Sequence, residues 1–228
     1  MTNFNRPDVY RNIHKALRKV MFDFSYAAGR IDIWRDEQLQ VLNRQFDAFV
    51  GILELHGAKE DNYSLPLLES KRAGSTKHNE EEHEQIQAEI EGLKQQMSAL
   101  IDSREAHRTD CYWNFYYAVN NFISTYLMHM QMEEIVMTNL FYELCSDEEL
   151  QAMTAAILNS LTPADSMMIL PNMIPAIEPS ERLHMMSRIR MTALPSAFDA
   201  LMKLCKEVLP PVDFLELKEE LDSATLTR

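Results

Sequence analysis

The sequence predicts an all-α protein in which an up-down four-helix bundle is followed by additional short helices. Only five of the 228 residues are glycine, and helix-favouring side chains dominate. Apolar residues recur three and four positions apart over long segments, and no segment alternates as a half-buried strand does. Seven of the nine prolines lie after residue 160, which separates long helices from a region of shorter ones.

The first two predicted helices each carry a histidine on their apolar face. The first begins near Pro7 and Asp8, and its inward stripe consists of Tyr10, His14, Leu17 and Met21. The second runs from about 36 to 68. Its apolar face consists of Leu42, Phe46, Phe49, Ile52, Leu53 and His56. We therefore expect both imidazoles to point into the bundle.

The third and fourth predicted helices follow turn signals. Residues 70–76 contain cations, a glycine and a capping serine, which end one helix and start the next. The third helix spans about 77–104 and has an acidic start that suits the helix dipole. The polar stretch 102–110 predicts another turn, so the fourth helix extends from Cys111 to about Cys145.

A new part of the chain is predicted to begin after residue 145. Ser146 and Glu149 have the spacing of a capping box, and prolines then divide the sequence into segments of helical length. We expect a bundle over residues 1–145 and a helical extension packed on it over residues 146–228.

Composition excludes several classes of protein. The net charge is −13 and no basic stripe compensates it, so nucleic-acid binding is not expected. No apolar run approaches the length of a membrane helix, and the charged N-terminal segment does not resemble a signal peptide. The three cysteines form no CxxC motif, which favours a reducing compartment. We therefore expect a cytoplasmic protein without membrane contact.

The histidines provide the strongest functional signal. One lies on each of the four long predicted helices, and two are followed four residues later by glutamate, as His56/Glu60 and His129/Glu133. Residues four apart lie about 40° apart around a helix, so each pair presents an imidazole and a carboxylate from one face. Burying these groups without a metal would be costly, which favours a metal site.

Chain geometry indicates that the four sites lie at one level of the bundle. In an up-down bundle, each turn must fall midway between successive sites. The midpoints fall at Asp36, at Ser70 and Lys71, and at His107, all in polar segments that suit turns. Antiparallel folding is therefore expected to bring four imidazoles and two carboxylates together.

The order H, H-x-x-x-E, H, H-x-x-x-E over about residues 8–145 resembles the hemerythrin-like, or HHE cation-binding, family. The resemblance implies a four-helix bundle around two iron ions with an oxo or hydroxo bridge. Manganese and zinc are the weaker alternatives. The resemblance implies terminal imidazole ligands at His14, His56, His83 and His129, and bridging carboxylates at Glu60 and Glu133.

The sequence departs from the oxygen-carrying members at two positions. Those members have a fifth histidine where this chain has Asn79, so either Glu80 or water is expected to replace it. Their last motif is H-x-x-x-x-D, which leaves Glu134 as an alternative to Glu133. An open position at one ion suits activation or sensing more than saturated carriage of oxygen.

Two functions follow from these residues. The first is a non-haem di-iron protein that binds or activates O2, peroxide or NO, as an oxygen, redox or iron sensor or as an oxidase. The second is an iron-dependent interaction module, whose C-terminal helices bind a protein partner or a second copy of the chain. No separate general base or organic-substrate site is evident, so catalytic residues are not assigned. Tyr63 and Tyr126, each about one helical turn from an expected ligand, are predicted to approach the site.

Overall fold

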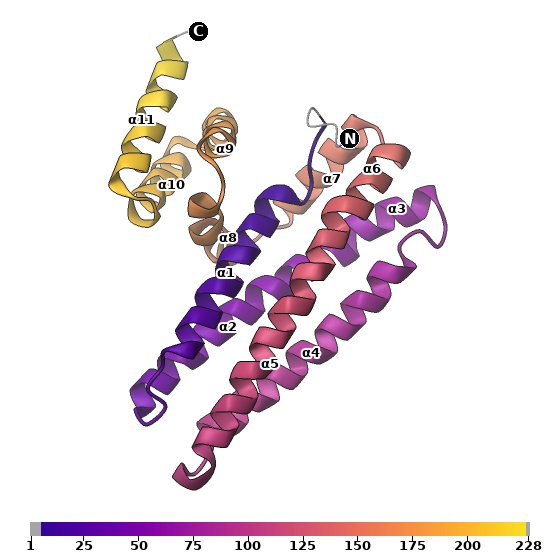
Figure 1. Ribbon diagram of the computed structural model, residues 1–228. Helices are drawn as coiled ribbons and strands as arrows, with labels where there is room; N and C mark the ends of the chain where they lie inside the picture. Colours follow the sequence, from indigo (N-terminus) through magenta and orange to yellow (C-terminus); the bar gives the residue numbers. More distant parts are fainter. Residues whose placement is uncertain (1–5, 227–228) are drawn as a thin grey trace.

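The computed structural model describes residues 6–226, which are helical and contain no strand. Four long helices lie side by side in up-down order (Figure 1): α1 (Arg11–Gly29), α2 (Asp36–Lys59), α4 (Lys77–Ile101) and α5 (Glu105–Met132). Helix α1 packs on α2 and α5, and α4 packs on the same two helices, which closes the bundle. The predicted fold class is confirmed.

Two π-helical turns interrupt this bundle near one end. The turn η1 (Glu60–Ser64) joins α2 to α3 (Leu65–Lys71), and η2 (Glu133–Met137) joins α5 to α6 (Thr138–Leu144). Pro66 lies in the first turn of α3, where its missing N–H is tolerated. The predicted helix over residues 36–68 is therefore a continuous helical segment with a local change of winding.

Two helix starts differ from the predicted positions. Asp8 does not begin α1 but precedes it, and its Oδ1 accepts hydrogen bonds from the backbone N–H groups of Tyr10 and Arg11 at 3.0 and 2.7 Å. The fourth helix begins at Glu105, so His107 lies in its first turn and not between helices. The polar residues after Glu105 were expected to form a turn because a solvated helix face and a loop share this composition.

The bundle has two hydrophobic clusters. The larger one fills the end nearer the α1–α2 and α4–α5 turns and includes Phe24, Phe49 and Phe115; the rings of Phe24 and Phe49 stack 4.7 Å apart. The smaller one, around Tyr10 and Phe141, fills the other end. Polar side chains buried in a layer between the two clusters need partners of their own, because burying them unsatisfied is costly.

We expect Phe115→Ala to lower the free energy of unfolding by about 3–5 kcal/mol, because it leaves a cavity among packed rings. Phe115 is fully buried against Phe24 and Phe46. Urea unfolding measures the change. Tyr117→Ala on the same helix is the control, since Tyr117 is 63% exposed and its loss should cost far less. Equal losses for the two variants would contradict this description of the core.

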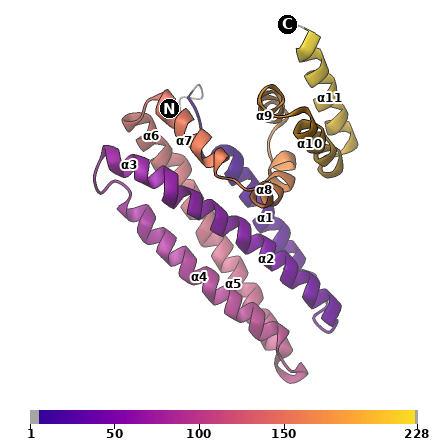
Figure 2. The same cartoon turned by 180° about the vertical axis from the view of Figure 1, so that it is seen from behind.

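Five helices follow the bundle: α7 (Asp147–Asn159), α8 (Pro163–Ala176), α9 (Pro179–Thr192), α10 (Pro195–Val208) and α11 (Pro211–Leu226). The predicted capping box at Ser146 and Glu149 is confirmed at the start of α7. Helix α7 buries Leu150 and Met153 in the smaller cluster of the bundle. Helix α8 packs on α1 and α2, and α9 to α11 lie beyond it around a third cluster (Figure 2).

None of the helices in residues 6–226 is both long and apolar enough to cross a membrane.

Candidate metal centre

The structure brings all six residues expected as metal ligands into the polar layer between the two clusters. They come from four helices and the two π-turns: His14, His56, Glu60, His83, His129 and Glu133. His14 and Glu133 are fully buried, and Glu60 and His129 are each 3% exposed. A turn was expected at His107, which instead lies in the first turn of α5, but the four histidines still lie at one level of the bundle.

The six side chains form two overlapping groups. His14, His56, Glu60 and Glu133 make the first group, and Glu60, His83, His129 and Glu133 make the second. Within each group, one ligand atom from every residue lies within 4.8 Å of the others. Both glutamates belong to both groups, so the geometry suits two cations that share two carboxylates.

The two oxygens of Glu133 face different groups. Its Oε2 lies 3.4 Å from His14 Nε2, whereas its Oε1 lies 3.3 Å from His129 Nε2 and 3.7 Å from His83 Nε2. Glu60 Oε2 lies between the groups, 3.3 Å from His56 Nε2 and 3.6 Å from His83 Nε2. Both carboxylates therefore lie between the two donor groups.

Each of the two shared glutamates is the first residue of a π-turn. The backbone N–H of Leu65 bonds to Glu60 O, and that of Thr138 bonds to Glu133 O, as the wider π winding requires. The Thr138 hydroxyl also donates to Glu133 O at 3.2 Å. Single π-turns within α-helices are frequent at functional sites. Two of them at the same level were not predicted, because one extra residue in a turn leaves no clear trace in hydrophobic spacing.

Three of the four imidazoles are oriented by carboxylates outside the two groups. The Nδ1 atoms of His14, His83 and His129 lie 3.0, 2.6 and 3.0 Å from carboxylate oxygens. The respective partners are Glu134, Asp61 and Glu82. Such contacts fix ring orientation and leave Nε2 as the ligand atom that points inward.

Glu134 is held from a second direction. Arg18 donates to both of its carboxylate oxygens, at 2.6 and 2.9 Å. Although burial opposes it, these bonds from His14 and Arg18 hold the pKa of Glu134 at about 2. Glu134 thus supports His14, and within the described residues it belongs to neither donor group.

Many buried polar atoms of the site have no hydrogen-bond partner within the described part of the chain. They are Tyr10 Oη, Glu60 Oε1 and Oε2, Asn79 Oδ1, His83 Nε2, His129 Nε2 and Glu133 Oε2. Burial of unsatisfied polar groups is unfavourable, and most native proteins contain only a few. The donor set therefore fits metal cations, which would satisfy the imidazole and carboxylate atoms together.

Burial and mutual charge shift the pKa values of the donors. Burial, and then the nearby His14, lower the pKa of His56 to about 3. Burial would also lower the pKa of His83, but its hydrogen bond to Asp61 and the nearby carboxylate of Glu133 raise it to about 9. Burial and the charge of Glu133 raise the pKa of Glu60, whereas His14 and His83 hold that of Glu133 low despite burial.

Asn79 and Glu80 lie in different surroundings. Asn79, at the position of the fifth histidine, is buried and donates to Glu133 Oε1 at 3.0 Å. Glu80 is exposed, accepts a hydrogen bond from Thr76 Oγ1 at 2.7 Å and lies outside both groups. The structure therefore does not bring Glu80 to the donors, because the face that it occupies is turned toward solvent.

The two tyrosines expected near the site lie in different surroundings. Tyr126 is buried with its ring 5.7 Å from that of His129, and burial followed by Glu60 and Glu133 raises its pKa. Tyr63 instead packs at the edge of the smaller hydrophobic cluster. Tyr10 was expected only in the apolar stripe of the first helix, but its buried ring lies 5.1 Å from that of His14. Tyr10 precedes His14 by four residues, about one helical turn, and this spacing could have indicated a position beside the donors.

A family model described as "Hemerythrin HHE cation binding domain" matches residues 6–141. This range contains α1 to α5, both π-turns, part of α6 and all six donors. No match was found among curated proteins or among solved structures. The family comparison and the donor geometry therefore agree on cation binding inside the bundle.

Proposed function

Because the chain belongs to the hemerythrin HHE cation-binding family, we propose that the six donors hold two iron ions which bind or activate O2 or a related small molecule. The observation that carries this proposal is the pair of donor groups that share Glu60 and Glu133. Such a centre suits an oxygen, redox or iron sensor, or an oxidase.

The chemistry of the donors favours iron. Each group combines two imidazoles with two carboxylates and contains no thiolate. Mixed nitrogen and oxygen ligation of this kind suits iron or manganese, while thiolates would favour softer ions. Bound iron would supply a Lewis-acidic and redox-active centre for O2, peroxide or NO.

The protein itself controls proton positions around the centre. Burial and the charges of Glu133 and Glu60 raise the pKa of the Tyr10 hydroxyl, so it stays protonated. The Tyr10 hydroxyl is a buried donor that forms no hydrogen bond within the described residues. We propose that Tyr10 shields His14 from water and that the protonated hydroxyls of Tyr10 and Tyr126 add no charge beside the donors.

We expect metal binding to release protons near neutral pH and to weaken as the pH falls. The pKa of His83 is about 9 in the metal-free protein, so its imidazole is protonated at pH 7 and must lose a proton to bind a metal through Nε2. Isothermal titration in buffers of different ionisation enthalpy measures this release. The affinity should increase from pH 6 to pH 9, and an affinity independent of pH over this range would contradict the prediction.

Metal analysis and visible absorption of the purified protein test the proposed function. The protein should contain iron, and reduction followed by exposure to air should change the absorption reversibly if it binds or senses O2. Sustained consumption of O2 or peroxide would instead indicate an oxidase. A protein that binds iron but shows no change with O2, peroxide or NO would contradict the proposed reactivity.

A specific contact supports an iron-dependent interaction module as the second function. Helix α7 packs on η1, and Lys59, which precedes Glu60, donates to Ser160 Oγ at 2.9 Å. Lys15, next to His14, pairs with Glu181 of α9 at 2.5 Å. The helices that carry the donors therefore touch the C-terminal helices. Hydrogen exchange of residues 160–223 with and without iron tests this link, since unchanged exchange would contradict it.

A further inference from the structure

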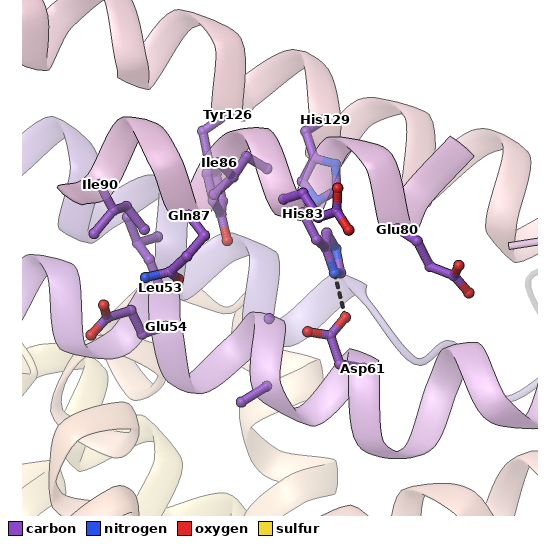
Figure 3. Close-up of a pocket in the computed structure, with 13 residues that line it drawn as sticks. Leu53, Glu54, Asp61, Glu80, His83, Ile86, Gln87, Ile90, Tyr126 and His129 are labelled. Atoms are coloured by element: carbon purple, nitrogen blue, oxygen red, sulfur yellow. Dashed lines mark hydrogen bonds and ion pairs between the residues drawn. The ribbon is translucent and has the colours of Figure 1, made fainter. Parts of the chain in front are cut away.

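One pocket of the bundle reaches the donors. It has a volume of about 610 Å³ and lies between α2 and α4 (Figure 3). His83 and His129 of the second group line it, together with Tyr126. Neither His14 nor His56 of the first group is part of its lining. The two groups therefore differ in their access to solvent.

The first group is closed on the side of His14. His14 has no exposed surface, and the buried ring of Tyr10 lies against it. The Nδ1 atom of His14 contacts the carboxylate of Glu134, to which Arg18 also donates a hydrogen bond. A cation that arrives from solvent therefore meets the second group before the first.

The lining of the pocket is acidic. Its charged residues other than histidine are all carboxylates: Glu54, Asp61, Glu80 and Glu84. At its base, the Nε2 atoms of His83 and His129 have no hydrogen-bond partner within the described residues, and His129 is only 3% exposed. A cleft lined by one sign of charge raises the local concentration of oppositely charged ligands. Divalent cations fit both the lining and the base.

A second pocket offers a less suitable route. Its volume is about 720 Å³, and its lining mixes three cations, Arg11, Lys15 and Arg18, with four carboxylates, Asp8, Glu134, Glu178 and Glu181. The cations pair with carboxylates, Arg11 with Asp8, Lys15 with Glu181 and Arg18 with Glu134, so the two signs of charge largely cancel here. This pocket therefore lacks the single sign of charge that would concentrate a divalent cation, and no residue of either donor group lines it.

Small residues of α2 keep the first pocket open. Gly57 and Ala58 line it, and a Cβ atom added at Gly57 would meet no atom within 4 Å. A larger side chain at residue 57 therefore has room to extend into the pocket without a clash at its first atom.

We propose that the pocket between α2 and α4 is the entrance for divalent cations, which reach the His83/His129 group first and then fill the His14/His56 group. The inference rests on the proposed function in one respect, namely that these donors bind metal. It adds a direction of entry and names residues of the route that are not ligands.

Loading of the metal-free protein with Co²⁺, followed by stopped-flow absorption, tests the entrance. Gly57→Leu should slow loading at least tenfold and leave the final amount of bound Co²⁺ unchanged. Gly92→Leu is the matched control, because Gly92 is also helical, has equally open surroundings and lies outside the pocket. It should load at the wild-type rate.

A rate for Gly57→Leu equal to that of the wild type would overturn the entrance while the metal site stands. Failure of the wild type to bind Co²⁺ or Fe²⁺ would overturn the proposed function itself. The two failures are therefore distinguishable.

Charge variants provide a second test that does not change side-chain volume. Glu80→Gln combined with Glu84→Gln should slow Co²⁺ loading several-fold at low ionic strength, and the difference should vanish at high salt. The control combines Glu91→Gln with Glu105→Gln, which removes the same charge from exposed positions outside the pocket. Equal slowing by both pairs would show that only net charge matters and would overturn the role of the pocket.

Discussion

Glu133→Gln is expected to abolish stable binding of both metal ions, whereas Glu134→Gln leaves two ions bound. Glu133 belongs to both donor groups and faces each with a different oxygen. Glu134 contacts only the outer nitrogen of His14, together with Arg18. Loss of an outer partner of this kind weakens metal affinity by about 10–100-fold.

Metal content after gel filtration, followed by competition with a chelator, measures both variants. The two substitutions make the same chemical change at neighbouring positions, so each is the control for the other. The reverse result, with metal lost from Glu134→Gln and kept by Glu133→Gln, would assign the bridging role to Glu134.

In the metal-free protein, Glu60→Met and Glu133→Met are expected to change stability in opposite directions. Neither carboxylate oxygen of Glu60 has a hydrogen-bond partner in the described chain, and burial and Glu133 raise its pKa. Replacing such a group with an apolar one is expected to raise the free energy of unfolding by about 1–3 kcal/mol. Glu133→Met should lower it by about 3–5 kcal/mol, because the histidines around it lose their partner.

The pH dependence follows from the same pKa shifts. The raised pKa of Glu60 means that its ionisation costs stability above the unfolded pKa of 4.5, so the gain from Glu60→Met should disappear as the pH falls toward that value. The lowered pKa of Glu133 means that its contribution is present above 4.5 and is lost as the pH falls through the folded pKa.

Urea unfolding with a chelator at pH 7 and pH 5 measures both effects. If both variants were destabilised equally, the six residues would form a structural polar network whose metal-free state is already satisfied. Both variants should also lose metal, which separates their shared effect on binding from their opposite effects on folding.

Much of the fold could be predicted because the long helices bury regular stripes. The spacing of Leu42, Phe46 and Phe49 predicted the inward face of α2, and all three side chains are buried. The start of α5 was missed because residues 105–110 are polar on a helix that is exposed there. The division at residue 145 stays a prediction, and α7 packs into the same cluster as Tyr10 and Phe141.

The donors could be predicted because each H-x-x-x-E pair occupies one helical face. The π-turns could not be predicted, and they explain why Tyr63 packs at the edge of the smaller hydrophobic cluster. Tyr63 lies inside η1, where the wider winding changes the direction of a side chain three residues after Glu60. Asp61 and Glu82 were missed because, in sequence, a carboxylate that orients a histidine looks the same as a surface charge.

Anaerobic titration of the metal-free protein with Fe²⁺ tests the central claim most directly. The two donor groups predict saturation at two ions per chain, and the combined variant His56→Ala and Glu133→Ala should retain neither ion stably. Saturation below two ions in the wild type, or two ions still bound by the combined variant, would contradict the assignment of these residues as a two-metal centre.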